Sequence, residues 1–179
     1  LYIVYENHTR NKELLKYAQT DALTGLYNKE TTEQLTDELL SEDENKSHAF
    51  LILDVDCFKQ INDIYGHAVG DIVLQKFGKL LKGTFREGDI LGRIGGDEFG
   101  VIMKNIQTKD IAMKKAEELL AKTQAYKIDE LKGNNISISI GISTAPQDGD
   151  CYMDLYKRAD QALYQAKRSG KARVCNYFS

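Results

Sequence analysis

Hydrophobic positions along the chain follow two periods, one typical of helices and one of strands. Residues 49–53, Ala-Phe-Leu-Ile-Leu, form an unbroken apolar run, which predicts a strand covered on both faces of its sheet. Over 135–144, Ile alternates with Ser, which predicts another strand. Apolar residues recur at helical spacing over 68–81 and 152–168, and the second segment ends before Gly170, a residue suited to stop a helix. Strands separated by helices favour an α/β fold with a central sheet and helices on both faces.

Further elements follow from capping residues and composition. Asn28 is expected to cap a helix that runs to about Glu42, and residues 173–178 form a short closing strand. Thr108 is expected to cap another helix, whose apolar face contains Ile111, Ala112, Ala116, Leu119 and Leu120. Residues 1–20 have a helical pattern that is too short for a coiled-coil prediction. We interpret them as a helical linker or the end of a signalling stalk, followed by one domain over 21–179.

A glycine-rich stretch lies between two short strand-like runs, 90–94 and 99–103. Gly95 and Gly96 predict a tight hairpin there, because the turns that favour hairpins need positive φ. Glycine also lets a ligand approach the main chain closely. Asp97 and Glu98 follow at the tip, where their adjacent negative charges repel each other. A hard cation would remove this repulsion, but a solvated hairpin tip explains the two acids equally well.

A second pair of acids ends the apolar run. Asp54 and Asp56 are two residues apart, which places both carboxylates on one side of an extended chain. Buried carboxylates without a partner are costly, so they are seldom decoration. Carboxylates at the end of a buried strand, beside a hairpin that carries more, resemble a Mg²⁺ site for phosphoryl or nucleotidyl transfer.

Composition excludes several classes of protein. The 179 residues are 42% hydrophobic and 28% charged, as in a globular domain, and a net charge of −3 without a basic stripe argues against nucleic acid as a partner. Three cysteines without metal-type spacing fit free thiols in a reducing cytoplasm. The chain has no membrane-length apolar run and starts at Leu1 instead of Met. We therefore expect a cytoplasmic piece of a membrane-bound or multi-domain sensor protein.

Five motifs carry a family resemblance over about 21–171. In order, they are Asp-Ala-Leu-Thr-Gly-Leu-Tyr-Asn at 21–28, Asp-Val-Asp-Cys-Phe-Lys-Gln-Ile-Asn-Asp at 54–63, Gly-His-Ala-Val-Gly-Asp at 66–71, Gly-Gly-Asp-Glu-Phe at 95–99 and Ser-Ile-Gly-Ile-Ser at 139–143. Together they resemble the GGDEF domain family, the diguanylate cyclases. The resemblance implies a five-stranded mixed sheet flanked by helices, similar to the palms of nucleotide cyclases and polymerases. It also implies condensation of two GTP into cyclic di-GMP, with release of two pyrophosphates.

The resemblance gives roles to the acids at the hairpin and the strand end. It implies that Asp54, Asp97 and the main-chain carbonyl of Val55 bind Mg²⁺, with Mn²⁺ as the alternative ion. Glu98 lies beside them, and its role stays open between a second metal ligand, a base for the 3′-hydroxyl and a structural acceptor. Asp97 and Glu98 are thus the candidate catalytic acids.

Other positions are implied to bind substrate. Asn62 and Asp71 match the positions that read guanine, whose N1–H and N2–H₂ donors suit a carboxylate and are missing from adenine. Without the resemblance, Asp71 is a charge near a helix N-terminus and Asn62 a turn residue. Gly95 and Gly96 would let the triphosphate lie against the backbone.

Three lysines are the candidate cations for phosphate. Lys59 is grouped with the catalytic residues, while Lys167 and Lys171 lie four apart around a helix end, so that both could face one anion. The sequence departs from the family here, since Gly170-Lys171-Ala172 replaces the usual Gly-Arg-Asn. Lysine keeps the charge but loses the planar two-donor geometry of arginine, which predicts weaker binding of GTP.

Arg86 and Asp89 lie ahead of the hairpin, with Arg86 nine positions before Gly95. On their own they are an ordinary charged turn. Their position resembles the inhibitory Arg-x-x-Asp motif of the family. The resemblance implies a product site in which Arg86 donates two bonds to the O6 and N7 edge of guanine.

The implied partners are GTP, cyclic di-GMP and an upstream sensory domain in the full-length protein. One domain has one metal and phosphate site, yet each GTP must act as nucleophile and as electrophile. Two domains facing each other across a two-fold axis satisfy both needs, so a homodimer is expected, transient in this fragment. The main alternative is a non-catalytic module that binds GTP or cyclic di-GMP. Such a module would have no use for the intact metal ligands.

Overall fold

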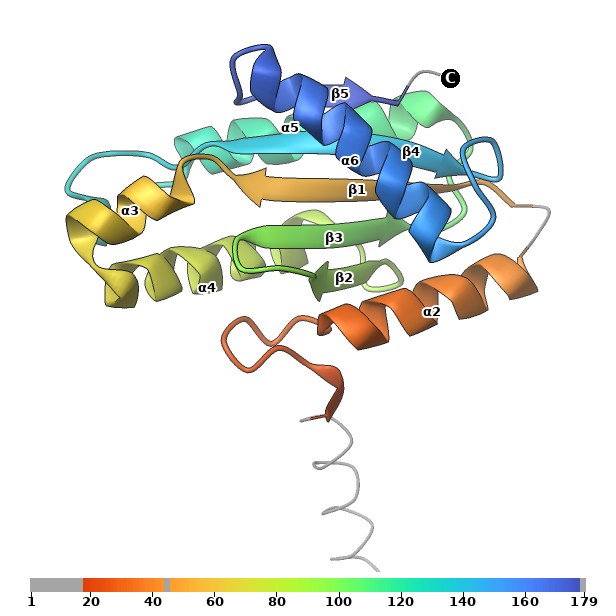
Figure 1. The fold of residues 1–179 in the computed structure, drawn as a ribbon, viewed down its shortest axis with the longest axis horizontal. Coiled ribbons are helices and arrows are strands. Elements are labelled where there is room, and N and C mark those ends of the chain that lie inside the picture. Colours follow the sequence, from red (N-terminus) through yellow and green to blue (C-terminus); the bar gives the residue numbers. More distant parts are fainter. Residues whose placement is uncertain (1–17, 44–45, 178–179) are drawn as a thin grey trace, which may run out of the picture.

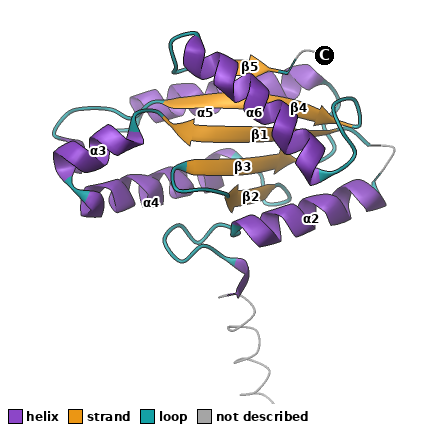
Figure 2. Cartoon of the chain, viewed as in Figure 1, coloured by secondary structure: helices purple, strands orange, loops and turns teal. Residues whose placement is uncertain are grey.

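The structure, a computed structural model, describes residues 18–43 and 46–177 as a sheet with helices on both faces (Figures 1 and 2). The helical segment predicted over 1–20 lies almost entirely outside the described residues. In chain order the elements are α2 (Lys29–Glu42), β1 (His48–Val55), α3 (Phe58–Tyr65), α4 (His67–Thr84), β2 (Ile90–Arg93), β3 (Glu98–Met103), α5 (Lys109–Ala125), the 3₁₀ turn η1 (Asp129–Leu131), β4 (Ile138–Ala145), α6 (Tyr152–Arg168) and β5 (Val174–Asn176).

The sheet has five strands in the order β2-β3-β1-β4-β5. β1 lies in the middle, antiparallel to both β3 and β4, and β2 pairs with β3 in the same sense. Only the β4–β5 pair is parallel among the described strands. The five-stranded mixed sheet implied by the resemblance is confirmed.

Side chains on β1 alternate between two cores, one on each face of the sheet. Leu51 and Leu53 pack with Phe77 on the face covered by α4 and α5. Phe50 and Ile52 belong to the other core, which α2 and α6 cover. Helix α6 crosses the front of the sheet in Figure 1. The predicted burial of this strand on both faces is therefore confirmed. Close packing on both faces holds β1 firmly, so the end of this strand has a well-defined position for its side chains.

The hairpin between β2 and β3 differs from the prediction. Its loop spans residues 94–97, and neither Gly95 nor Gly96 takes a positive φ, so the prediction of a tight turn that needs one is wrong. The longer loop closes because the main-chain N–H groups of Ile94 and Gly95 both donate to the carbonyl of Glu98, at 2.9 and 3.1 Å. Close approach explains the glycine at 95, where a Cβ would lie 3.0 Å from that of Glu98.

Helix ends agree with the sequence in most places. The Asn28 side chain accepts a bond from the N–H of Thr31, and α6 stops two residues before Gly170, whose φ is 111°. The α5 prediction was partly wrong, since Thr108 makes no side-chain cap bond and Ile111 is 39% exposed. Among the described helices, none combines the length and the apolar character that crossing a bilayer requires.

Candidate active site

The acids of the hairpin meet the end of β1. Glu98 opens β3 directly opposite Asp54 in the antiparallel register, so that their side chains lie on the same face. Asp97 precedes Glu98, and its carbonyl accepts a 3.2 Å bond from the N–H of Val55. Asp54, Asp97 and Glu98 are all half-buried. The sheet thus gathers three carboxylates, predicted from two distant parts of the sequence, around one strand end.

Burial raises the pKa of the Asp54 carboxyl, and the charges of Asp97 and Asp56 raise it further. Lys167 opposes this effect, because its ammonium lies 2.7 Å from Asp54 Oδ2. The strand end therefore carries more negative charge than its one contacting cation balances. Three carboxylates and the neighbouring carbonyl of Val55 are the oxygen ligands that a hard divalent cation prefers. By their chemistry, these residues could hold Mg²⁺ or Mn²⁺.

Glu98 has the same electrostatic character. Burial raises the pKa of its carboxyl, and so do the charges of Asp160 on α6 and Asp54. The hydroxyl of Tyr156 donates to Glu98 Oε1 at 3.4 Å, a long contact that with Lys167 opposes the shift. Tyr156 was missed in the sequence, where it is simply part of the α6 pattern. A carboxyl with a raised pKa can accept and return a proton more readily than an ordinary surface glutamate.

Asp56 lies near enough for its charge to act on Asp54, but its carboxylate is bonded to other partners. β1 ends at Val55, and the Asp56 carboxylate accepts bonds from the hydroxyls of Ser137 and Ser139, at 2.8 and 2.7 Å, and from the N–H of Ala172 at 3.1 Å. The expectation that it lies with Asp54 on one side of the strand assumed that the strand continues. Asp56 is 6% exposed and anchors the segment after α6 to the sheet.

The two candidate guanine readers lie on adjoining helices. Asn62 belongs to α3, not to a turn, and Asp71 is exposed on the early part of α4. Asn62 Oδ1 fills the space where Gly70 lacks a side chain, only 1.9 Å from the position a Cβ would take. Glycine is therefore required at position 70 if Asn62 is to stay there. The α3–α4 pair holds Asn62 beside the helix that carries Asp71.

The candidate phosphate cations have separate positions. Lys59 is exposed on the first turn of α3, just after the end of β1. Lys167 contacts Asp54, whereas Lys171 Nζ lies 3.1 Å from the thiol of Cys57. That contact raises the pKa of Lys171, and the charges of the nearby acids add to it. The two lysines of the α6 end therefore reach different partners around the end of β1.

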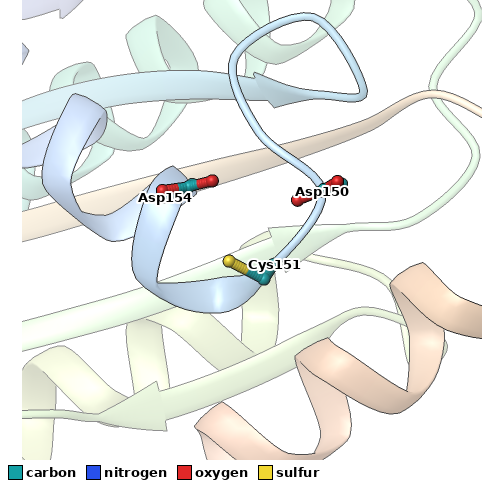
Figure 3. A group of neighbouring side chains, drawn as sticks. All are labelled: Asp150, Cys151 and Asp154. Atoms are coloured by element: carbon teal, nitrogen blue, oxygen red, sulfur yellow. The ribbon is translucent and has the colours of Figure 1, made fainter.

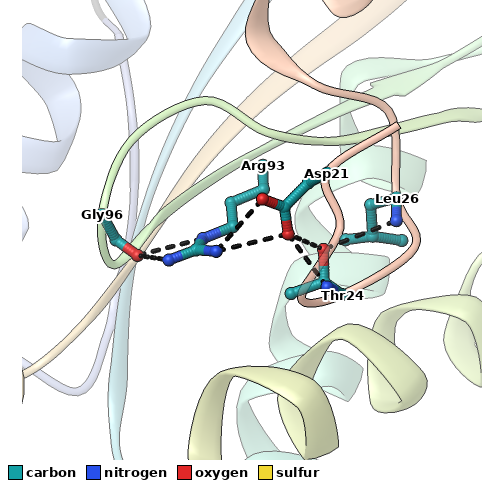
Figure 4. A network of polar contacts seen from close by, with 5 residues as sticks. All are labelled: Asp21, Thr24, Leu26, Arg93 and Gly96. Carbon is teal, nitrogen blue, oxygen red and sulfur yellow. Dashed lines mark hydrogen bonds and ion pairs between the residues drawn. The ribbon is translucent and has the colours of Figure 1, made fainter. Parts of the chain in front are cut away.

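An arginine network ties the hairpin to the start of the domain (Figure 4). Arg93, the last residue of β2, donates from Nη1 to both oxygens of Asp21 at 3.2 Å, and from Nη2 to the Gly96 carbonyl at 2.7 Å. Burial opposes ionisation of Asp21, but bonds from Thr24 and the charge of Arg93 lower its pKa overall. No pattern in the sequence indicates this network. The only signals were an aspartate in the first motif and an arginine beside the glycines.

Arg86 and Asp89 lie together before β2. Arg86 Nε donates a hydrogen bond to Asp89 Oδ1 at 3.1 Å, and Arg86 Nη2 donates one to the carbonyl of Lys104. The same Asp89 oxygen accepts a 3.1 Å bond from the Lys104 N–H. The Asp89 side chain is 3% exposed and that of Arg86 is 62% exposed. The pair lines a cavity of about 500 Å³ with Phe85, Met103 and other residues.

The matching family model is described as "Diguanylate cyclase, GGDEF domain" and covers residues 18–173. The chain belongs to the GGDEF family. Its fold is therefore the palm-like cyclase fold of that family. This agrees with the resemblance carried by the five motifs, which all lie within the matched range.

Known GGDEF proteins resemble the chain over nearly its whole length. Diguanylate cyclase A of Treponema denticola is 37% identical over 170 residues, which are 92% of this chain and 46% of that protein. Response regulator PleD of Caulobacter vibrioides is 37% identical over 177 residues, 95% of this chain and 39% of PleD. The chain spans about half the length of such curated relatives, or less. A crystal structure of the coiled coil and GGDEF domain of DgcB from Caulobacter crescentus, in complex with c-di-GMP, superposes with a TM-score of 0.89 at 25% identity, covering 98% of this chain and 94% of that one.

A further acidic group of the GGDEF domain lies at the start of α6 and contains none of the candidate site residues (Figure 3). Asp150, Cys151 and Asp154 have ligand atoms within 4.8 Å of one another. Cys151 is the N-cap residue of α6, and Asp154 lies in its first turn, where the helix dipole stabilises negative charge. Both aspartates are exposed. The helix start accounts for this group without a metal ion.

Proposed function

We propose that the domain is a diguanylate cyclase, which condenses two GTP into cyclic di-GMP with release of two pyrophosphates. The observation that carries this proposal is the meeting of Asp54, Asp97 and Glu98 around one strand end, in a member of the GGDEF family. A domain that only bound nucleotide would have no use for three crowded carboxylates, whose mutual repulsion it would have to bear.

Each condensation step is an in-line displacement. The 3′-oxygen of one GTP forms a bond to the α-phosphorus of the other, and the bond from that phosphorus to the bridging oxygen breaks, so that pyrophosphate leaves with the electron pair. In this proposal Glu98 takes up the proton of the attacking hydroxyl, and the raised pKa of its carboxyl supports that role. Asp54, Asp97 and the Val55 carbonyl would hold Mg²⁺ or Mn²⁺, which when bound stabilises charge on the entering and leaving oxygens.

The other site residues bind and orient GTP. Asn62 and Asp71 read the guanine edge from α3 and α4, and Asp71 rejects adenine because adenine leaves its carboxylate without donors. Gly95 and Gly96 leave the backbone of the hairpin open to the triphosphate.

Three lysines supply positive charge for the phosphates. Lys59 follows the end of β1 on α3, while Lys167 and Lys171 approach from the end of α6. Lys171 contributes one point charge, where an arginine would donate two parallel bonds. We therefore propose that this site binds GTP more weakly than a site with arginine at that position.

Catalysis requires two copies of the domain. Each copy offers one group of carboxylates, but the cyclic product needs two bonds of the same kind, related by two-fold symmetry. A transient homodimer brings two such sites face to face, and an upstream sensory domain in the full-length protein would set that geometry. Specific activity is then expected to rise with protein concentration, because association is second order.

Product inhibition is proposed at the pair formed by Arg86 and Asp89. The buried Asp89 carboxylate and the Lys104 carbonyl hold an exposed guanidinium in place. A fixed guanidinium suits the O6 and N7 edge of guanine, which it can meet with two parallel bonds. The pair lies at the opposite end of β2 from the hairpin, so product bound there leaves the carboxylates free.

The test is turnover of GTP by the purified domain. We expect cyclic di-GMP and pyrophosphate by ion-exchange chromatography when GTP and Mg²⁺ are present, and no cyclic product from ATP. The specific activity should rise as the protein concentration is increased. Binding of GTP or cyclic di-GMP without any turnover, at every protein concentration and with either Mg²⁺ or Mn²⁺, would favour the non-catalytic module instead.

A further inference from the structure

Lys167 forms an ion pair with the carboxylate of Asp54, a proposed metal ligand. It lies in the last turn of α6, and its ammonium reaches the end of β1, 2.7 Å from Asp54 Oδ2. The Asp54 side chain is 16% exposed and that of Lys167 is 36% exposed, so the contact lies at the edge of the protein and open to water on one side. The pair is thus accessible to a competing cation.

The charges that surround this ammonium are mostly negative. The negative charge of Asp97, in the hairpin, acts on Asp54 of β1, and so does the positive charge of Lys167. The charges of Asp54 and of Asp160, on α6, act on Glu98 of β3, and Lys167 acts on Glu98 as well. In the described part of the chain, Lys167 is the only cation that forms an ion pair with Asp54. It therefore stands where a divalent cation would balance the same carboxylates.

A lysine is well suited to leave such a position. Its ammonium is a compact charge on a flexible four-carbon stem, and a metal ion at the same carboxylate oxygen would repel it. Next to Lys167 lies a cavity of about 760 Å³, lined also by Asp160, Gln165 and Arg168. The side chain can turn toward that open space without disturbing the core, since the ammonium is already at the surface.

We propose that Lys167 is an exchangeable cation, which holds Asp54 while the domain is free of nucleotide and transfers to the phosphates when nucleotide binds. A divalent cation then binds Asp54 tightly only together with nucleotide, because nucleotide removes the competing ammonium. Metal and nucleotide each strengthen the binding of the other, as linkage requires. The identity of the nucleotide rests on the proposed function. The competition between ammonium and metal for Asp54 does not.

The first test is Mn²⁺ binding to the nucleotide-free domain, measured as loss of the free-ion signal in electron paramagnetic resonance. Lys167→Met keeps the length of the stem and removes the charge. We expect it to bind Mn²⁺ roughly tenfold more tightly than wild type, at the lower end of the roughly 5–150-fold range typical of coupled sites. Lys157→Met, an exposed lysine on the same helix, makes the same change in net charge and should leave the Mn²⁺ affinity unchanged. Adding Asp54→Asn to Lys167→Met should abolish the gain.

The second test is GTP binding in metal-free buffer, measured by calorimetry. Lys167→Met should bind GTP several-fold more weakly than wild type and Lys157→Met, since the exchange gives Lys167 a phosphate partner. Circular dichroism checks the fold, and Lys167→Gln replaces Lys167→Met if the latter is unfolded.

Equal or weaker Mn²⁺ binding by the Lys167 variant overturns the competition, and unchanged metal-free GTP affinity overturns the transfer to phosphate. A domain that made no cyclic di-GMP would refute the proposed function, yet both titrations would still decide the role of Lys167.

Discussion

The two ends of strand β2 carry charged groups in opposite states of balance. Before the strand, the guanidinium of Arg86 is matched within the protein by the buried carboxylate of Asp89 and the carbonyl of Lys104. After it, Asp97 and Glu98 join Asp54, and the contacting ammonium balances only part of their charge. We call the first end finished, because its charged groups are paired within the protein. We call the second incomplete, because its excess of negative charge would be balanced only by a further cation. The two ends should therefore respond differently to neutralising substitutions.

The largest effect is expected at the incomplete end. Asp97→Asn removes one negative charge and one proposed metal ligand, and loss of such electrostatic stabilisation typically lowers kcat by at least ~10²–10³. The fold should persist, because the Asp97 side chain belongs to neither core. Initial rates of cyclic di-GMP formation measure the effect, with Asp110→Asn on α5 as a matched control that keeps full activity. Near-normal turnover by Asp97→Asn would remove this residue from the site.

At the finished end, a substitution should change inhibition and not the chemistry. Arg86→Ala removes the proposed contact with guanine, worth about 1–3 kcal/mol by analogy with arginine–guanine pairs. The affinity for product should fall about tenfold or more, since about 1.4 kcal/mol is a factor of ten. The initial rate should stay at the wild-type value. Progress curves with added cyclic di-GMP measure this, with Lys109→Ala as the control, and identical slowing of wild type and Arg86→Ala would contradict the product site.

Neutralising a carboxylate should lower the free energy of unfolding at the end before β2 and raise it at the end after β2. The larger change is expected before β2. Asp89→Asn weakens bonds from Arg86 and from the Lys104 N–H to a nearly buried side chain. We expect a loss of about 1 kcal/mol in the free energy of unfolding, the typical net value of such a bond. Urea denaturation of the purified domain measures it. An unchanged midpoint would mean that Asp89 does not hold Arg86 in solution.

The smallest effect is a gain in stability after β2. Burial, Asp160 and Asp54 raise the pKa of Glu98 above its ordinary value of 4.5, so ionising it costs more in the folded domain than in the unfolded chain. The wild-type domain therefore loses stability as the pH rises from about 4.5 through the raised pKa. Without metal, Glu98→Gln should be more stable than wild type at pH 7 by less than about 1 kcal/mol, since water screens this half-buried group.

This gain should become small at about pH 4, where Glu98 is mostly protonated in both states of the wild type. Thermal melts at the two pH values, in a chelating buffer, give the comparison. A destabilised Glu98→Gln at pH 7 would show that Glu98 is favourably paired in the apo domain. Glu117→Gln, on the exposed face of α5, is the control for a change in net charge.

Local patterns predicted much of the fold because β1 and β4 are buried on both faces and two helix ends have a recognisable residue, Asn28 before α2 and Gly170 after α6. The run over 49–53, the cap at Asn28 and the stop at Gly170 each depend on neighbours within a few residues. The mixed topology came from the family resemblance alone, since periodicity does not say which strands pair. Strand β4 shows the limit of local pattern, because alternation of Ile and Ser usually predicts one polar face. Its serines are buried, and Ser139 is bonded to Asp56.

Long-range contacts were not predictable in the same way. Arg93 reaches Asp21 across 72 positions, and Lys171 reaches Cys57 across 114, so no spacing rule could pair them. Lys167 could be named as a phosphate cation, but its contact with Asp54 depends on where α6 ends relative to β1. The roles of these residues in chemistry are still predictions that the experiments above decide.

Asp56 has a consequence for the order in which the domain is made. Its three hydrogen-bond partners follow it in the sequence, at separations of 81, 83 and 116 positions. On the ribosome, β1 emerges long before Ala172, and closing such large loops is slow because their entropy must be lost first. The segment after α6, which carries Lys171, gains its bond to Asp56 only when Ala172 has emerged. A chain still being synthesised thus contains the complete signature motif before the segment around Lys171 is held against the end of β1.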